Sequence, residues 1–123
     1  MDIAKEKLGV IVEKINASSK AQSVFITNVA GKDVNWEMSF QFNLDKEEPY
    51  YLEVKNQAII LSDGTKSDAV IVMSGESEAI GRISEGKGDF THAISREQIT
   101  VEKGKVMDVI RLTRAITIVL KNK

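Results

Sequence analysis

Apolar and polar residues alternate strictly from Val34 to Leu44. Every even position in this stretch is apolar, and every odd position is polar or charged. Side chains on a strand alternate between its two faces, so the stretch predicts a strand with one buried face and one face in water. We interpret it as the strand around which the chain folds, because no other segment offers so much apolar surface in so few residues.

Shorter segments with the character of strands follow it. They cover Tyr50–Lys55, Ala58–Leu61, Ala69–Met73 and Ile99–Glu102. The pair Asn56-Gln57 has the length of a tight hairpin turn, so we expect a meander of three strands up to residue 61. Ala69–Met73 is apolar at successive positions, which is typical of a strand that is covered on both faces or is at least central in the sheet.

A helical period of apolar residues predicts the remaining elements. We expect helices over residues 3–16 with Asp2 as N-cap, after the cap Ser74, in a short segment capped by Asp89, and from Val106 to Asn122. Residues 19–30 fit a strand or a helix, and we favour a helix that begins with the capping-box spacing of Ser19-Lys20-Ala21-Gln22 and stops at Gly31. The last segment is rich in β-branched residues, so Ala115–Leu120 could form a strand, but its apolar face favours a helix.

The totals indicate one ordinary globular domain. A chain of 123 residues fits a single domain, with a helical segment over 1–31 and a sheet with covering helices over 32–123. The net charge of −1 gives no electrostatic reason to expect nucleic acid or an anionic membrane as a partner. The longest apolar run, Ala69–Met73, is far shorter than the roughly 20 residues that span a bilayer, so we expect no stable membrane insertion. Without cysteine or a signal peptide at Met1-Asp2, the chain suits the reducing cytoplasm.

Motifs that would carry catalysis are weak. Gly81–Gly88 follows the phosphate-binding loop pattern, but Gly88 replaces the required Ser or Thr, so we interpret it as a helix-breaking turn. Asp89, His92 and Ser95 could be drawn as a triad, yet one short helix does not make them converge, and we favour a partly exposed histidine without a catalytic role. With one histidine and no cysteine, we expect no metal site and no cofactor. The acidic turn of Asp45, Glu47 and Glu48 is interpreted as solvated.

The apolar inventory leaves two interpretations open. It comprises Trp36, Met38, Phe40, Phe42, Tyr50, Met73 and Phe90. These residues could form only a core, because apolar side chains are usually inside for packing. They could also line a cavity for an apolar ligand, since helices laid on one face of a sheet leave such a space.

Four segments resemble those of a known family. They are Tyr51-Leu52-Glu53-Val54-Lys55-Asn56, Asp68–Ser74, Gly86-Lys87-Gly88-Asp89 with Ala93, and Ile99–Gly104. By their order and spacing, from Trp36 to about Ile116, the chain resembles the sterol carrier protein two lipid-binding domain. Two departures stand out, because Glu97-Gln98 occupy the place of a usual Gly-Lys pair and Gln57 replaces a usual glycine.

The resemblance implies an α+β fold in which helices cover one face of a five-stranded mixed sheet and enclose an apolar tunnel. It implies non-enzymatic binding or transfer of a fatty acyl chain, acyl-CoA or sterol-like lipid. The terminal helix lacks strong intrinsic propensity, so we expect it to be the gate. The expected lining residues are Trp36, Met38, Phe40, Phe42, Leu52, Phe90, Ile94, Leu112 and Ile116. The alternative is an accessory or interaction module of the same fold, with a filled core, that serves a partner enzyme or a homodimer.

Overall fold

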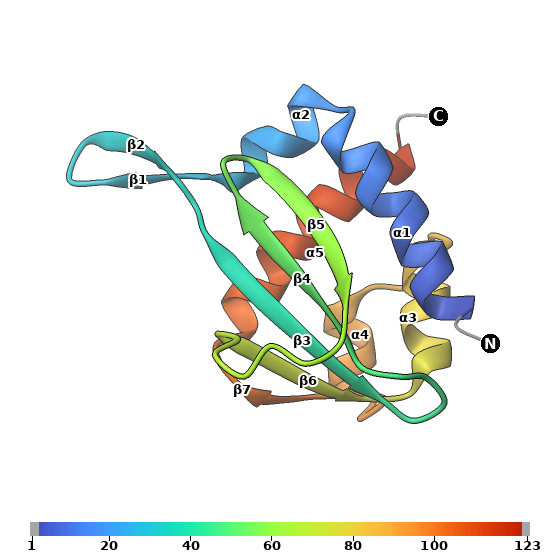
Figure 1. Cartoon of the computed structure of the whole chain (residues 1–123). Helices are drawn as coiled ribbons and strands as arrows, with labels where there is room; N and C mark the ends of the chain where they lie inside the picture. Colours follow the sequence, from blue (N-terminus) through green and yellow to red (C-terminus); the bar gives the residue numbers. More distant parts are fainter. Residues whose placement is uncertain (1–2, 122–123) are drawn as a thin grey trace.

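The computed structural model describes residues 3–121 as an α+β fold (Figure 1). The helices are α1 (Ile3–Asn16), α2 (Ser19–Gln22), the short 3-10 helix η1 (Ser23–Phe25), α3 (Ser77–Ser84), α4 (Phe90–Ser95) and α5 (Val106–Lys121). The strands are β1 (Ile26–Val29), β2 (Lys32–Asn35), β3 (Met38–Leu44), β4 (Tyr50–Lys55), β5 (Ala58–Asp63), β6 (Ile71–Gly75) and β7 (Ile99–Lys103). The expected cap Asp2 and the expected helix end Asn122 lie outside the described residues.

The main sheet has five strands in the order β5-β4-β3-β6-β7. All neighbours are antiparallel except β3 and β6, which pair in parallel, so the sheet is mixed as expected. In the register, Phe40 lies between Leu52 of β4 and Ile71 of β6, and Phe42 lies between Tyr50 and Met73. The inward-facing side chains of three strands therefore form one continuous apolar surface.

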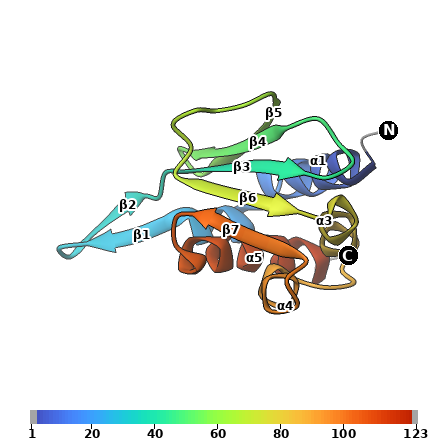
Figure 2. The ribbon, with the colours of Figure 1, turned by 90° about the horizontal axis from the view of Figure 1, so that it is seen from below.

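The helices lie together on one face of this sheet, as the sequence predicted (Figure 2). The Asn16 side chain attaches the end of α1 to the edge strand β5: its Nδ2 donates to the Ile59 carbonyl at 2.7 Å, and its Oδ1 accepts from the Ile59 amide at 2.9 Å. Helix α1 also packs on α3, and α5 packs on α1, α2 and α4. The buried side chains between the two layers form a single hydrophobic cluster.

The helix expected over residues 19–30 is wrong beyond Phe25. This segment begins with α2, whose N-cap is Ser18 rather than Ser19. It continues through η1 into the β1–β2 hairpin, which projects from the body (Figure 1). Ala30 and Gly31 both have positive φ, at 53° and 83°, which is the conformation that closes a tight hairpin. The β-branched residues of β1 suit the extended backbone.

The single strand expected over Val34–Leu44 is divided in two. Val34 belongs to the hairpin and is 40% exposed, whereas Trp36 lies between the strands and is buried. The Trp36 amide donates to the Phe25 carbonyl at 2.7 Å, so the backbone leaves the hairpin there and enters β3 in the main sheet.

The polar face of β3 is not entirely in water, contrary to expectation. Ser39 and Gln41 are buried because the connection between β5 and β6 crosses this face. Gln41 Nε2 donates to the Gly64 carbonyl at 3.3 Å, and its Oε1 accepts from the Lys66 amide at 2.7 Å. Ser39 Oγ accepts from the Val70 amide at 2.9 Å. Polar residues on this face therefore hold the crossover that makes the parallel pairing possible.

The apolar strand expected over residues 69–73 begins two residues later, as β6, although it is central in the sheet as predicted. Glu76, not Ser74, is the N-cap of α3. The side chain of Asp45 accepts hydrogen bonds from the Ser77 amide and hydroxyl, and the amide lowers the pKa of that carboxyl. The acidic turn thus caps α3 from outside the helix.

Candidate functional site

The nine residues expected to line a tunnel come together between the sheet and the helices. They derive from the β3 segment, from β4, and from α4 and α5. All belong to the buried cluster, except that Met38 and Ile94 are half-buried and pack against it. Segments far apart in the sequence therefore supply one apolar surface.

Aromatic contacts organise this surface. Trp36 stacks on Phe25 with a centroid distance of 6.0 Å and lies 6.2 Å from Phe40. Phe42 stacks on Tyr50 at 5.3 Å and lies 6.4 Å from Phe90. Such distances are typical of favourable aromatic pairs.

Phe25 and Tyr50 belong to this surface, but the sequence did not assign them to the lining. Both side chains are fully buried. Phe25 was missed because its segment was interpreted as a regular helix, which gave no reason to place it beside Trp36. Tyr50 could have been found from the alternation of β4, in which it shares a face with Leu52.

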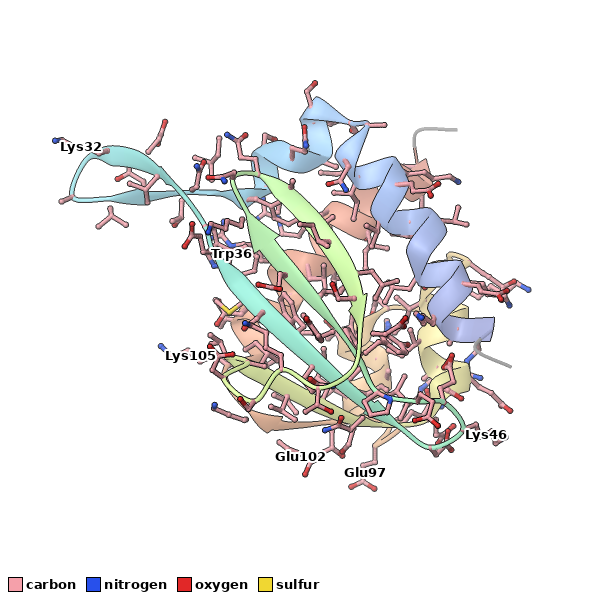
Figure 3. All side chains as sticks on the ribbon, in the orientation of Figure 1. Lys32, Trp36, Lys46, Glu97, Glu102 and Lys105 are labelled. Carbon is pink, nitrogen blue, oxygen red and sulfur yellow. The ribbon has the colours of Figure 1, made fainter. Side chains whose placement is uncertain are left out.

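Arg111 of α5 closes one end of the surface. Its Nη1 donates to the carbonyl of Val24 at 2.8 Å and to that of Ile26 at 3.2 Å. Its guanidinium carbon lies 5.1 Å from the centre of the Trp36 ring, a cation–π distance. Trp36 lies where the hairpin leaves the body, with Lys32 at the far tip (Figure 3).

The pockets found among the described residues lie away from this apolar surface. A pocket of about 370 Å³ opens between α1, α3 and the β3–β4 turn, where Lys46 is labelled in Figure 3. Its charged lining residues are Lys7, Lys46, Glu47, Glu78, Arg82 and Glu85. Lys46 pairs with Glu78 at 3.0 Å, and the pairing of Lys7 with Glu85 lowers the pKa of that carboxyl. Of the nine expected lining residues, only Met38 borders any of the four pockets described, and the other residues around that pocket include the polar Ser39, Glu53 and Lys66.

Two motifs were interpreted from the sequence as structural: Gly81–Gly88, and Asp89 with His92. The structure shows where each of them lies. Gly81 lies inside α3, with no strand directly before it, so the loop is a helix end rather than a phosphate-binding loop. Asp89 caps α4 by accepting from the His92 amide at 2.8 Å, and the same carboxylate oxygen lies 3.0 Å from His92 Nδ1. Both groups occupy the exposed start of one helix. Within residues 3–121, no three His, Asp or Glu side chains gather closely enough to hold a metal ion.

No helix among the described residues is both long and apolar enough to cross a membrane.

Comparisons with known proteins give matches of structure alone, because no family model and no curated protein matches the sequence. A ubiquinone synthesis protein, UbiJ-SCP2, matches with a TM-score of 0.66 at 10% identity, over 90% of this chain and 90% of its own. Sterol carrier protein 2 from Yarrowia lipolytica, in its apo form, matches with a TM-score of 0.56 at 22% identity, over 99% of this chain and 89% of its own.

An enzyme also contains a similar segment. The inverting sec-alkylsulfatase Pisa1 from Pseudomonas sp. matches 66% of this chain with a TM-score of 0.54 at 13% identity, and the match spans 12% of the enzyme. Structures similar to this chain therefore occur in a ubiquinone synthesis protein, a sterol carrier protein and an alkylsulfatase. On the strength of matches that cover most of its length, this chain has the fold of sterol carrier protein 2 domains.

Proposed function

We propose that this chain is a non-enzymatic, cytoplasmic carrier that binds an apolar ligand between the sheet and the helices. The ligand classes are a fatty acyl chain, an acyl-CoA and a sterol-like lipid. The observation that carries the proposal is the convergence of nine apolar residues, from four segments, between the two layers. The likeness to a sterol carrier protein supports the same class of ligand.

Desolvation would drive binding. Each methylene that leaves water contributes about 0.8 kcal/mol, so ten methylenes would contribute roughly 8 kcal/mol. Part of this gain is spent on separating side chains that contact one another in the absence of ligand. Helix α5 is the suitable gate, because its β-branched residues have low helix propensity and its packing partners include α4 and η1.

Trp36 allows a direct test, because it is the only tryptophan in the sequence. Its side chain is 8% exposed and contacts Phe25 and Phe40. We expect titration of delipidated protein with palmitate to shift the Trp36 emission and to give a complex of matching mass in native mass spectrometry. Butyrate, which carries the same carboxylate on a short chain, is the matched control and should give neither. No shift together with no bound lipid would overturn the carrier function.

The close contacts among the buried aromatic side chains favour a second candidate. An accessory module with a filled core, serving a partner enzyme or forming a homodimer, would need no ligand, and one similar structure is of a ubiquinone synthesis protein. This candidate predicts no response to palmitate. A homodimer would appear in light scattering as a mass that doubles with rising protein concentration.

A further inference from the structure

Two adjoining hollows beside α4, one against α3 and the other against the loop between α3 and α4, carry an excess of positive charge. One has a volume of about 70 Å³ and the other about 410 Å³, and Lys87, Asp89, His92 and Arg96 border both. Arg82 of α3 borders the smaller one. The walls therefore hold three permanent cations against one carboxylate, in a chain whose net charge is −1.

The single carboxylate is already engaged. Asp89 accepts from the His92 amide and contacts the His92 ring, so it caps α4 rather than neutralising the arginines. The next acidic residue along the chain, Glu97, is exposed and points outward at the edge of the molecule (Figure 3). Lys87 lies 3.5 Å from Glu85, which also pairs with Lys7.

The two arginines have unused hydrogen-bonding capacity. Arg82 Nη2 donates to Gln98 Oε1 at 3.3 Å, and within the described part of the chain no carboxylate lies within ion-pair distance of Arg82 or Arg96. A guanidinium carries five N–H donors in a planar fork that matches phosphate oxygens. Arg96 borders both hollows, and Arg82 borders the smaller one as well as the pocket beside α1, so guanidinium donors are available to a phosphate bound there.

The floor of the smaller hollow belongs to the apolar core. It is made by Ala79, Ile83 and Ala93, which are all buried. Phe90, three residues before Ala93 on α4, is fully buried and contacts Phe42 of the apolar surface. Ala93 and Phe90 share a face of α4, so the cationic rim, formed by Arg82, Lys87 and Arg96, lies next to the end of α4 that reaches the apolar surface.

We propose that the gap between α3 and α4 binds the phosphate or diphosphate head group of an acyl ligand, with Arg82, Lys87 and Arg96 as its contacts. This inference rests on the proposed function and deepens it, because it selects phosphate-bearing amphipaths over neutral lipids. The acyl chain enters between the layers, and the head group stays at the rim, where charge-assisted hydrogen bonds to phosphate are strong.

The test compares dodecanoyl-CoA with dodecanol, which have matched chains and different head groups. In the double variant Lys87→Gln, Arg96→Gln, we expect calorimetric titration to show dodecanoyl-CoA affinity reduced by about tenfold or more, from the loss of two charged contacts. Dodecanol affinity should stay within about twofold. The control double variant Lys14→Gln, Arg114→Gln removes the same charges from exposed positions on α1 and α5 and should bind both ligands like the unmodified protein.

Free coenzyme A and inorganic phosphate separate the remaining outcomes. If dodecanoyl-CoA binds the test variant and the unmodified protein equally, the head-group site is overturned and the carrier stands. If coenzyme A binds and is weakened in the test variant while dodecanol does not bind, the site stands and the carrier is overturned. Inorganic phosphate that binds as tightly as coenzyme A would overturn the head-group assignment in favour of a free anion. If none of the four probes binds, both proposals are overturned.

Discussion

At the scale of single residues, both departures from the family pattern occupy strained backbone. Gln57 has φ of 63° and Glu97 has φ of 61°, in the left-handed region that favours glycine. In that region a residue with a Cβ is destabilised by about 1–2 kcal/mol, because its Cβ lies too close to the following carbonyl oxygen. The usual glycines of the family suit this conformation, and the chain keeps the turns without them. Surrounding strand pairing, such as Lys55 with Ala58 across the first turn, maintains these conformations.

Replacing Gln57 with glycine should therefore stabilise the protein. We expect Gln57→Gly to raise the free energy of unfolding by about 1 kcal/mol, since relief of strain exceeds the entropy that glycine adds to the unfolded chain. Urea denaturation measures this change. Gln57→Ala is the control, because it removes the hydrogen bond from Gln57 Nε2 to Asn35 Oδ1 and keeps the Cβ. An equal gain in both variants would refute the assignment to backbone strain.

At the scale of elements, α5 and the projecting hairpin depend on each other through Arg111. The guanidinium satisfies two carbonyls at the start of the hairpin and covers the ring of Trp36. The hairpin has no pairing to the main sheet, so this contact and the Trp36–Phe25 backbone bond orient its base.

Arg111→Met should release this junction while keeping a long apolar side chain on α5. We expect the free energy of unfolding to fall by about 1–3 kcal/mol, because two partly buried carbonyls lose a charged donor. The Trp36 emission should also shift, since its cation partner is gone. Arg114→Met, at an exposed position three residues later, should change neither quantity. Equal effects of the two variants would contradict a specific role for Arg111.

At the scale of the whole molecule, a sheet and a layer of helices share one hydrophobic cluster. Leu8 of α1 and Leu112 of α5 are both buried in it, with 1% and 0% exposure. Only Leu112 belongs to the proposed lining. The cluster thus supplies a matched pair of positions that distinguishes general stability from ligand binding.

Leu8→Ala and Leu112→Ala should each reduce the free energy of unfolding by about 2–5 kcal/mol. Only Leu112→Ala should tighten palmitate binding. This substitution leaves an apolar cavity beneath α5, so the acyl chain can enter without first separating packed side chains. Urea denaturation and Trp36 titration measure the two quantities. The same change of affinity in both variants, or no change in either, would argue against α5 as the gate of the proposed site.

The sequence by itself determined what depends on local periodicity. The alternation in β3 and β4 and the helical period in α1 and α5 identified these elements and most of their buried faces, because strand and helix geometry decide which neighbouring side chains share a face. Together with the family resemblance, these elements led to the correct fold class. They also led to nine apolar residues that the structure brings together, whose ligand stays a proposal.

Only the tertiary structure decided the features that join distant segments. The burial of Gln41 depends on a crossover that arrives from residues 64–66, the stacking of Phe25 on Trp36 depends on the hairpin between them, and the cationic rim is assembled from α3, the following loop and α4. None of these has a periodic signature, because each arises from contacts across the sequence rather than from the conformation of one segment.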